Sequence, residues 1–186
     1  MSEVTKRALE DSLKKLIATK DLSKITIGDI TDDVGISRMT FYYHFKDIYD
    51  LIEWSCMEDA KKALEGKKTY DTWQEGFLQI FNEVKKNKPF IISVYHSISR
   101  EQVEIYLNKL TYNLLIGVLK EESEGQMVKP EDEKFIADFY KYAFVGIMLD
   151  WIKNDMQEDP DVLIRKIGTI MKGNFGKAIE AFKYSK

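Results

Sequence analysis

The segment from Thr26 to Lys46, TIGDITDDVGISRMTFYYHFK, most constrains what this 186-residue chain can fold into. The apolar residues of its first half recur at spacings of three and four, at Ile27, Ile30 and Val34. That spacing predicts a short amphipathic helix. Thr26 with Asp29 three residues later is a capping-box pattern at its start. Gly35 is expected to end it, because a left-handed backbone conformation is cheap for glycine. The segment therefore opens with a helix and a tight turn.

A second short helix is predicted directly after this turn. Ser37 can cap its first turn by accepting a hydrogen bond from a free backbone N–H. Phe41 and Phe45 lie one turn apart and are expected to anchor the helix inward, while the remaining side chains face outward without any acidic residue among them. Two short helices joined by a glycine turn form the layout of a helix-turn-helix DNA-binding unit. The alternative is an ordinary αα-hairpin whose aromatic residues form a core.

The outward-facing residues suit duplex DNA chemically. A hydroxyl, a guanidinium or an imidazole can donate a hydrogen bond to a phosphate oxygen, and tyrosine and methionine offer apolar contact to base edges and thymine methyl groups. The candidate DNA-binding residues are Thr26, Ser37, Arg38, Met39, Thr40, Tyr42, Tyr43, His44 and Lys46.

This segment resembles the DNA-binding domain of the TetR family of bacterial transcription regulators. In that family a capped helix, a Gly-Ile/Val-Ser turn and a Tyr-x-His-Phe ending follow one another, as they do here from Thr26 to Phe45. The family usually has a lysine where this chain has Ile48, which removes one phosphate contact. The resemblance implies phosphate contacts from Thr26, Thr40, Tyr42, His44 and Lys46. It implies base-edge contacts from Arg38, Met39 and Tyr43.

The charge of the chain does not by itself mark a DNA-binding protein. The net charge is −3, and the first 50 residues hold eight Lys or Arg against nine Asp or Glu. DNA binding would therefore depend on the local field of residues 37–46, which carry Arg38 and Lys46 without an acid. A DNA-binding helix that neutralises few phosphates per subunit would give a shallow slope of log K against log salt. A dimer would double this slope.

The rest of the chain, with only three prolines, reads as helices. The fold class is all-α, with about nine helices in total. Beyond the two short helices, apolar periodicity and caps predict helices at about residues 3–19, 47–64, 71–88, 89–98, 100–122, 131–154 and 159–182. We expect an N-terminal three-helix helix-turn-helix domain at 1–46, a linking helix at 47–66 and a helical dimerisation and effector domain at 67–186, with the junction near Gly66–Thr69.

The helix at 131–154 is apolar on two sides. One face carries Phe135, Phe139, Tyr142, Gly146 and Leu149, and another carries Ile136, Tyr140, Ala143, Ile147 and Trp151. One core can cover only one face, so the helix is either central in its domain or shared with a second molecule. In the TetR family the last two helices usually pair with those of a second copy. The candidate dimer residues are Phe135, Phe139, Tyr142, Gly146, Leu149, Ile167, Met171 and Phe175.

The resemblance also implies a ligand site in the C-terminal domain, between its helices. Residues that could line such a pocket, or equally fill a core, are Trp73, Phe77, Tyr95, His96, Tyr106, Tyr112, Asn113, Phe144 and Met148. The C-terminal half is also similar to a TetR subgroup that includes dihydroxyacetone-utilisation regulators. One regulator in that subgroup acts with a protein partner. An unknown small-molecule effector and a protein partner are therefore both open.

Enzyme chemistry finds little support in the residues. With two histidines and a single cysteine, neither an HExxH helix nor a Cys/His zinc site can be assembled. Gly168 and Gly173 stand at phosphate-loop spacing, but Asn174 and Phe175 follow where Lys and Ser/Thr are needed, so a helix break or packing is favoured. Cys56 is expected to be a buried, inert thiol. We expect no catalysis, no cofactor, no bound metal and no membrane span, and a cytoplasmic protein.

Taken with the resemblance, these features imply a sequence-specific DNA-binding transcription regulator. Its expected form is a homodimeric repressor that binds a palindromic operator in double-stranded DNA and is released by a small-molecule effector. Two alternatives remain at this point: a TetR-like coregulator whose C-terminal domain docks a protein partner, and a helical adapter that does not bind DNA.

Overall fold

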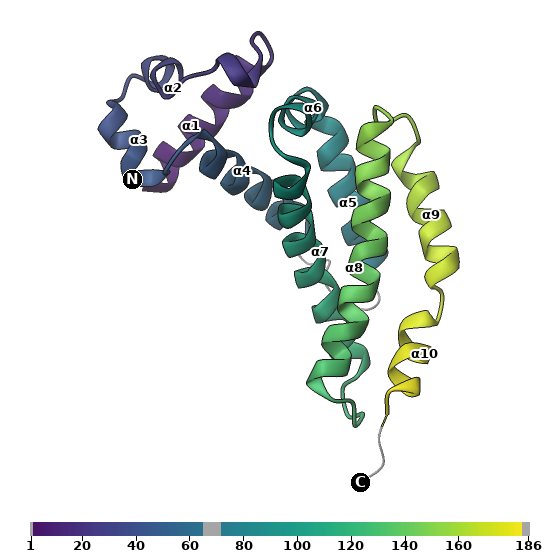
Figure 1. The fold of residues 1–186 in the computed structure, drawn as a ribbon. Coiled ribbons are helices and arrows are strands. Elements are labelled where there is room, and N and C mark those ends of the chain that lie inside the picture. Colours follow the sequence, from purple (N-terminus) through teal and green to yellow (C-terminus); the bar gives the residue numbers. More distant parts are fainter. Residues whose placement is uncertain (1, 65–71, 184–186) are drawn as a thin grey trace. The chain divides into compact units, whose positions relative to one another are not determined.

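The computed structural model describes residues 2–64 and 72–183, and these residues form an all-α fold without a strand (Figure 1). Within them lie ten α-helices and one 3-10 helix. The chain divides into two compact units, residues 1–59 with 87–103 and residues 60–86 with 104–186. The junction expected at Gly66–Thr69 lies outside the described residues.

The first unit contains the N-terminal helices and one later hairpin of the chain. Its elements are α1 (Ser2–Ile17), the 3-10 helix η1 (Leu22–Lys24), α2 (Ile27–Val34), α3 (Arg38–His44), most of α4 (Ile48–Ala63), α6 (Lys88–Ser97) and the start of α7 (Arg100–Glu122). In α1, the helix expected at about residues 3–19, Leu9, Leu13 and Ile17 are buried. Helix α6 groups with this unit because Phe90 and Val94 are buried in it, whereas the sequence placed these residues in the C-terminal domain.

Both short helices have the expected ends. Thr26 and Asp29 form a complete capping box at the start of α2, and Gly35 ends the helix with φ +75°. A non-glycine residue would be strained in this left-handed conformation. The Ser37 hydroxyl accepts the backbone N–H of Thr40 and so caps α3. The local signals of the sequence are confirmed here.

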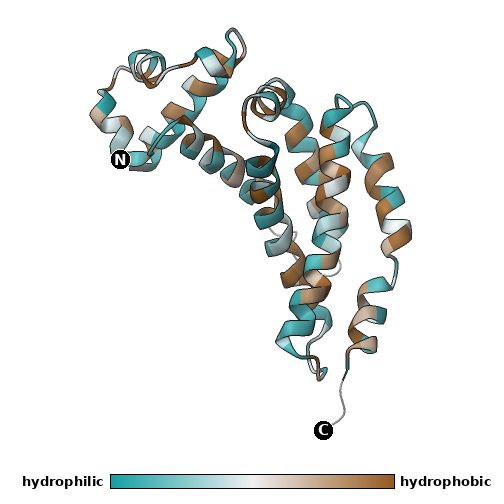
Figure 2. Ribbon diagram, viewed as in Figure 1, coloured by the Kyte–Doolittle hydropathy of each residue, from teal (hydrophilic) through white to brown (hydrophobic). Residues whose placement is uncertain are grey.

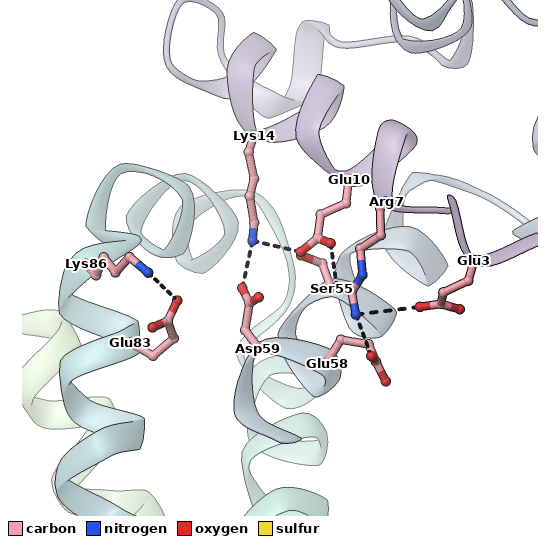
Figure 3. Close-up of polar contacts among 9 residues, drawn as sticks. All are labelled: Glu3, Arg7, Glu10, Lys14, Ser55, Glu58, Asp59, Glu83 and Lys86. Atoms are coloured by element: carbon pink, nitrogen blue, oxygen red, sulfur yellow. Dashed lines mark hydrogen bonds and ion pairs between the residues drawn. The ribbon is translucent and has the colours of Figure 1, made fainter. Parts of the chain in front are cut away.

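A polar cluster joins α1 to α4 in a part of the interior that the sequence did not single out. Glu10 is only 4% exposed and accepts hydrogen bonds from Arg7 at 2.9 Å, Lys14 at 2.8 Å and Ser55 at 2.7 Å. Arg7 also reaches Glu58 of α4, and Lys14 pairs with another α4 carboxylate in the same way, that of Asp59 (Figure 3). These contacts hold α4 against α1.

Cys56 lies half-buried on α4. Burial raises the pKa of its thiol to about 12, so the thiol stays protonated at neutral pH. A thiolate is the reactive form of cysteine, so the raised pKa agrees with the inert thiol expected here, whereas full burial of Cys56 was expected and the residue is half-buried.

The second unit is built around α7 and α8. Its elements are α5 (Trp73–Lys86), the remainder of α7, α8 (Pro130–Lys153), α9 (Pro160–Met171) and α10 (Asn174–Ala181). Four large aromatic side chains interlock inside it. The rings of Phe77 and Phe144 stack with centroids 4.0 Å apart, and Trp73 meets both of them and Phe175 edge-on.

The final helix expected at 159–182 is two helices. Gly173 adopts φ +71° between α9 and α10, which ends the first helix and starts the second in a new direction. Gly168 serves close packing instead, because a Cβ at this position would lie 2.6 Å from the side-chain nitrogen of Gln74 on α5. The helix break or packing role expected of the two glycines is confirmed, with the break at Gly173 and the packing at Gly168. The single helix expected at 159–182 is wrong, since apolar spacing continues across the break and does not report backbone direction.

Candidate nucleic-acid interface

Helix α3 presents its aromatic residues in two opposite directions. Phe41 and Phe45 are buried, as their spacing predicted, and their rings lie 6.0 Å apart. Met39, Tyr42 and Tyr43 are 79%, 58% and 82% exposed. A group of large apolar side chains that stays exposed on a helix marks an interaction site. The exposed set is therefore placed where a partner surface can reach it.

His44 lies at the end of α3, half-buried between two aromatic neighbours. Its ring meets Tyr43 edge-on with centroids 5.0 Å apart and tilts against Phe45 at 6.4 Å. These contacts restrict the imidazole to one side of the helix end. Lys46 follows two residues later with its side chain exposed, and its backbone N–H donates to the Asp50 carboxylate at 2.9 Å. The backbone from α3 to α4 is thereby held in place beside both side chains.

The hydroxyl of Thr26 is already used by the helix cap. It donates to Asp29 Oδ2 at 2.7 Å and accepts the backbone N–H of Asp29 at 3.1 Å. A hydroxyl has one proton, so Thr26 as placed has none left for a phosphate. The first-turn backbone N–H groups of Ile27 and Gly28 lack intrahelical acceptors and are the donors at this helix end.

Ser37 and Thr40 share one hydroxyl–hydroxyl hydrogen bond of 2.9 Å at the start of α3. Ser37 also accepts the backbone N–H of Thr40 at 3.1 Å. One of the two hydroxyl protons therefore remains available to an outside acceptor. If Thr40 donates within the pair, the proton of Ser37 points outward.

The acidic residues beside α3 are partly neutralised from α1 and the turn after it. Lys20 pairs with Asp29 at 2.9 Å and Lys15 pairs with Asp33 at 2.5 Å. Hydrogen bonds from Thr26 and Lys20 lower the pKa of Asp29 to about 2, so this carboxylate is charged at neutral pH but paired. Pairing weakens the negative field near α3, which carries no acid of its own.

The residues expected to line an effector pocket are divided between the two units and differ in burial. Trp73, Phe77, Phe144 and Met148 are buried in the core of the second unit, Tyr95 and His96 belong to the first unit, and Asn113 is exposed. Tyr106 and Tyr112 lie half-buried on α7. A surface depression of about 540 Å³ in the second unit is lined by none of these nine residues. Trp73, Phe77 and Phe144 form part of a core, because their rings pack directly against one another.

The residues expected at a dimer interface separate into two groups. Phe135, Phe139 and Tyr142 on α8 are 62%, 64% and 63% exposed, and Gly146 is exposed as well. Figure 2 shows that hydrophobic and hydrophilic residues alternate along the ribbon of this helix. The other four were misplaced on that surface, because they are buried in the core of the second unit: Leu149, Ile167, Met171 and Phe175. Ala143, which the sequence assigned to the opposite face of α8, is exposed with the first group.

Comparison with known protein families identifies the family of this chain. Residues 11–53 match the family described as "Bacterial regulatory proteins, tetR family", and residues 71–173 match the TetR C-terminal family described as "Transcriptional regulator C-terminal region". The chain belongs to the TetR family. It is thus a transcriptional regulator with a helix-turn-helix DNA-binding domain, and its family is not one of enzymes.

Individual TetR relatives agree with this assignment. The HTH-type dhaKLM operon transcriptional activator DhaS of Lactococcus lactis is 23% identical over 94 residues, which cover 50% of each chain. The uncharacterised HTH-type regulator YxbF of Bacillus subtilis is 21% identical over 191 residues, covering 96% of this chain and 49% of the relative. The aligned residues thus span about half the length of both curated relatives.

Solved structures show the same TetR fold. The dihydroxyacetone kinase operon activator DhaS aligns with a TM-score of 0.72 at 19% identity, covering 97% of this chain and 99% of the other. NalD of Pseudomonas aeruginosa, the secondary repressor of the MexAB-OprM efflux pump, aligns at 0.60 with 15% identity, covering 92% and 96%. In the described part of this TetR-family chain, none of the helices has the length and apolar character of a membrane span.

Proposed function

We propose that this TetR-family protein is a homodimeric, sequence-specific repressor that acts on a palindromic operator in the cytoplasm. The observation that carries the proposal is the outward face of α3, where Met39 and Tyr43 are the most exposed apolar residues of a helix without an acidic side chain. Phosphate contacts from Tyr42, His44 and Lys46 would fix the helix over the duplex, and base-edge contacts would select the sequence.

Protection of DNA upstream of its own gene tests this proposal. The expected result is a footprint with two half-sites related by a two-fold axis, with centres about one helical turn or a multiple of it apart. The Tyr42→Ala/His44→Ala double variant should lose the footprint, while its circular dichroism spectrum and melting temperature stay those of the wild type, because neither side chain is part of the core. A double variant that protects the operator as well as the wild type contradicts the proposed interface.

The two-fold arrangement requires a dimer, for which α8 supplies the surface. Its exposed residues Phe135, Phe139, Tyr142, Ala143 and Gly146 lie on one side of the helix, and Phe135 continues onto Phe182 after α10, with ring centroids 6.2 Å apart. Nothing lies within 4 Å of a Cβ built at Gly146, so a second helix can approach closely there. An isologous contact about a two-fold axis buries this surface on both copies at once.

Analytical ultracentrifugation distinguishes this dimer from a monomer. The wild type should sediment as a dimer at micromolar concentration, and Phe139→Glu should sediment as a monomer because it places a charge in the apolar contact. Ile105→Glu is the matched control, since Ile105 is 54% exposed on α7 of the same unit and outside this surface. A wild type that is only monomeric, or a Phe139→Glu variant that stays dimeric, excludes the α8 surface as the interface.

The release of the repressor has two candidate causes. A small-molecule effector is usual for regulators of this kind, and a protein partner is the second candidate. The aromatic core of the second unit favours the second candidate, because Trp73, Phe77 and Phe144, which the sequence predicted to line a ligand pocket, pack against one another. DhaS, a similar protein, is an operon activator, so transcription in vitro from the protected promoter should be measured in both directions.

A further inference from the structure

Gly28 on α2 lies directly beneath the side chain of Arg38 on α3. A Cβ built at Gly28 would be 2.6 Å from Nη2 of Arg38, 3.3 Å from its Cζ and 3.4 Å from its Nε. All three nearest atoms belong to the guanidinium group, so the glycine provides the space in which that group lies. Gly28 is itself buried, although it stands in the first turn of a surface helix.

No polar contact among the described residues holds the guanidinium in this position. Across residues 2–64 and 72–183, the side chain of Arg38 has no hydrogen-bond or ion-pair partner. Its position is therefore set by packing on α2, and its donors remain available to an outside acceptor. Arg38 is the first residue of α3 and is exposed, next to Met39 on the proposed DNA-binding face.

We propose that Gly28 is a positioning residue for Arg38 and thereby a determinant of operator sequence preference. This inference rests on the proposed function. An arginine side chain that is free in solution loses much conformational freedom when it contacts DNA, which weakens the contact. Packing against the bare Cα of Gly28 restricts the guanidinium in advance. A side chain at residue 28 would push it away, because the guanidinium is the flexible end of the pair.

The substitution Gly28→Ala separates positioning from folding. Alanine is favoured over glycine within a helix and φ here is helical, so the melting temperature should stay unchanged or rise by about 1–3 °C. The clash is relieved by moving the Arg38 side chain and leaves the backbone in place. Binding to a panel of operator half-sites with single base-pair changes is then measured for wild type, Gly28→Ala, Arg38→Ala and the double variant.

We expect Arg38→Ala to flatten the preference at one or two base pairs by about 5- to 150-fold, the range of a good arginine–base contact. Gly28→Ala should reduce the preference at those same positions by at least about fivefold. Adding Gly28→Ala to Arg38→Ala should change nothing further, because the displaced side chain is then absent. A Gly28→Ala variant with wild-type preference, or additive losses in the double variant, overturns the inference.

A measurement without DNA keeps this inference separate from the proposed function. The Nε–H group of Arg38 should be ordered in the free wild-type protein by ¹⁵N relaxation and become mobile in Gly28→Ala. Order in the wild type with no DNA binding at all would reject the proposed function alone. A mobile Arg38 side chain in the free wild type would reject the positioning role of Gly28, whatever the protein binds.

Discussion

Individual side chains of α3 depend on the residues behind them for their direction. Phe41 and Phe45 are fixed in the core, which turns Tyr42 and Tyr43 outward on the same short helix. The hydrogen bond between Ser37 and Thr40 leaves one hydroxyl proton for an outside acceptor, whereas the proton of Thr26 is held by Asp29. The Ser37–Thr40 pair is therefore a better donor to a phosphate than Thr26, although the family resemblance placed Thr26 at a phosphate.

A single cation tests the electrostatic part of the interface. Lys46→Ala should reduce the magnitude of the slope of log K against log salt by about 0.9 per subunit, because one fewer counterion is released from DNA. Tyr43→Ala should leave that slope unchanged and alter sequence preference, since tyrosine carries no charge to the duplex. Fluorescence anisotropy over a salt series measures both, with Lys153→Ala on α8 as the control. Equal slopes for wild type and Lys46→Ala would place this lysine away from phosphate.

The capping box of α2 gives a pH prediction at the residue scale. The pKa of Asp29 is about 2 in the folded chain and near 3.8 without the cap, so its stabilising effect is complete above about pH 4 and is lost as the pH falls to about 2. Asp29→Asn should therefore lower the melting temperature at pH 6, and the difference from the wild type should shrink between pH 4 and 2. A difference that stays constant over this range would mean that the charge of Asp29 does not stabilise α2.

The short pair of helices was predictable because its signals are local. The capping box spans four residues, and the turn needs only Gly35 and Ser37. Contacts between distant residues carry no such signal, so the position of Arg38 over Gly28 did not follow from either residue type. The same limit applies to the residues expected to line a pocket, because aromatic spacing on a helix is the same for a core residue and for a cavity wall.

At the scale of elements, the cluster around Glu10 holds α1 against α4. Burial alone would raise the pKa of Glu10, but hydrogen bonds from Lys14, Ser55 and Arg7 outweigh it and leave the pKa lowered. The charged form is therefore stabilised in a nearly inaccessible place. Removing the charge of this carboxylate takes one acidic partner from Arg7 and one from Lys14, which keep the α4 carboxylates of Glu58 and Asp59.

Glu10→Gln should reduce the free energy of unfolding at pH 7 by about 3 kcal/mol, since the amide keeps the shape but not the charge. Urea unfolding measures this change. Glu3→Gln is the control, because Glu3 pairs with the same arginine at 3.6 Å but is 64% exposed, and it should cost less than about 0.5 kcal/mol. The lowered pKa means that the Glu10 effect is complete above about pH 4.5 and diminishes below it. Equal effects of the two variants would show that the cluster is only a surface ion pair.

Helix ends were predictable where a cap or a proline marks them. Asp47 accepts the backbone N–H of Asp50 at the start of α4, and Pro160 stands in the first turn of α9. The sequence could not show which of two glycines breaks the helix. Gly173 does so, whereas Gly168, five residues earlier in the same apolar pattern, allows close packing. Residue type alone does not distinguish the two conformations of glycine.

At the scale of the whole molecule, the two apolar sides of α8 indicated more than one contact surface. One side is now occupied by the core of the second unit, through residues such as Tyr140, Phe144 and Met148. The other side retains three exposed aromatic residues. The sequence could not assign Leu149 to the correct side of α8, because two apolar faces of one helix are chemically alike and only the packing of its neighbours separates them. Ile167 and Met171 on α9 and Phe175 on α10 were misassigned because an apolar residue looks the same in a core and in an interface.

A dimer that reads two half-sites should show its symmetry in the salt dependence of binding. The wild type on the full operator should have twice the slope of log K against log salt that the monomeric Phe139→Glu variant has on one half-site, because two copies of α3 release counterions together. Because the two DNA-binding domains are linked in the dimer, the dimer should also bind the full operator about 10²- to 10⁴-fold more tightly than the monomer does.

Both quantities come from one anisotropy titration series, with Ile105→Glu as the dimeric control. If Phe139→Glu binds the full operator with the slope and affinity of the wild type, the two readers are coupled through DNA rather than through α8. If the slopes of wild type and variant are equal on a half-site but differ twofold on the full operator, each copy makes the same contacts and α8 supplies only the connection. The dimer then adds affinity without adding a new DNA contact, as a two-fold axis through α8 requires.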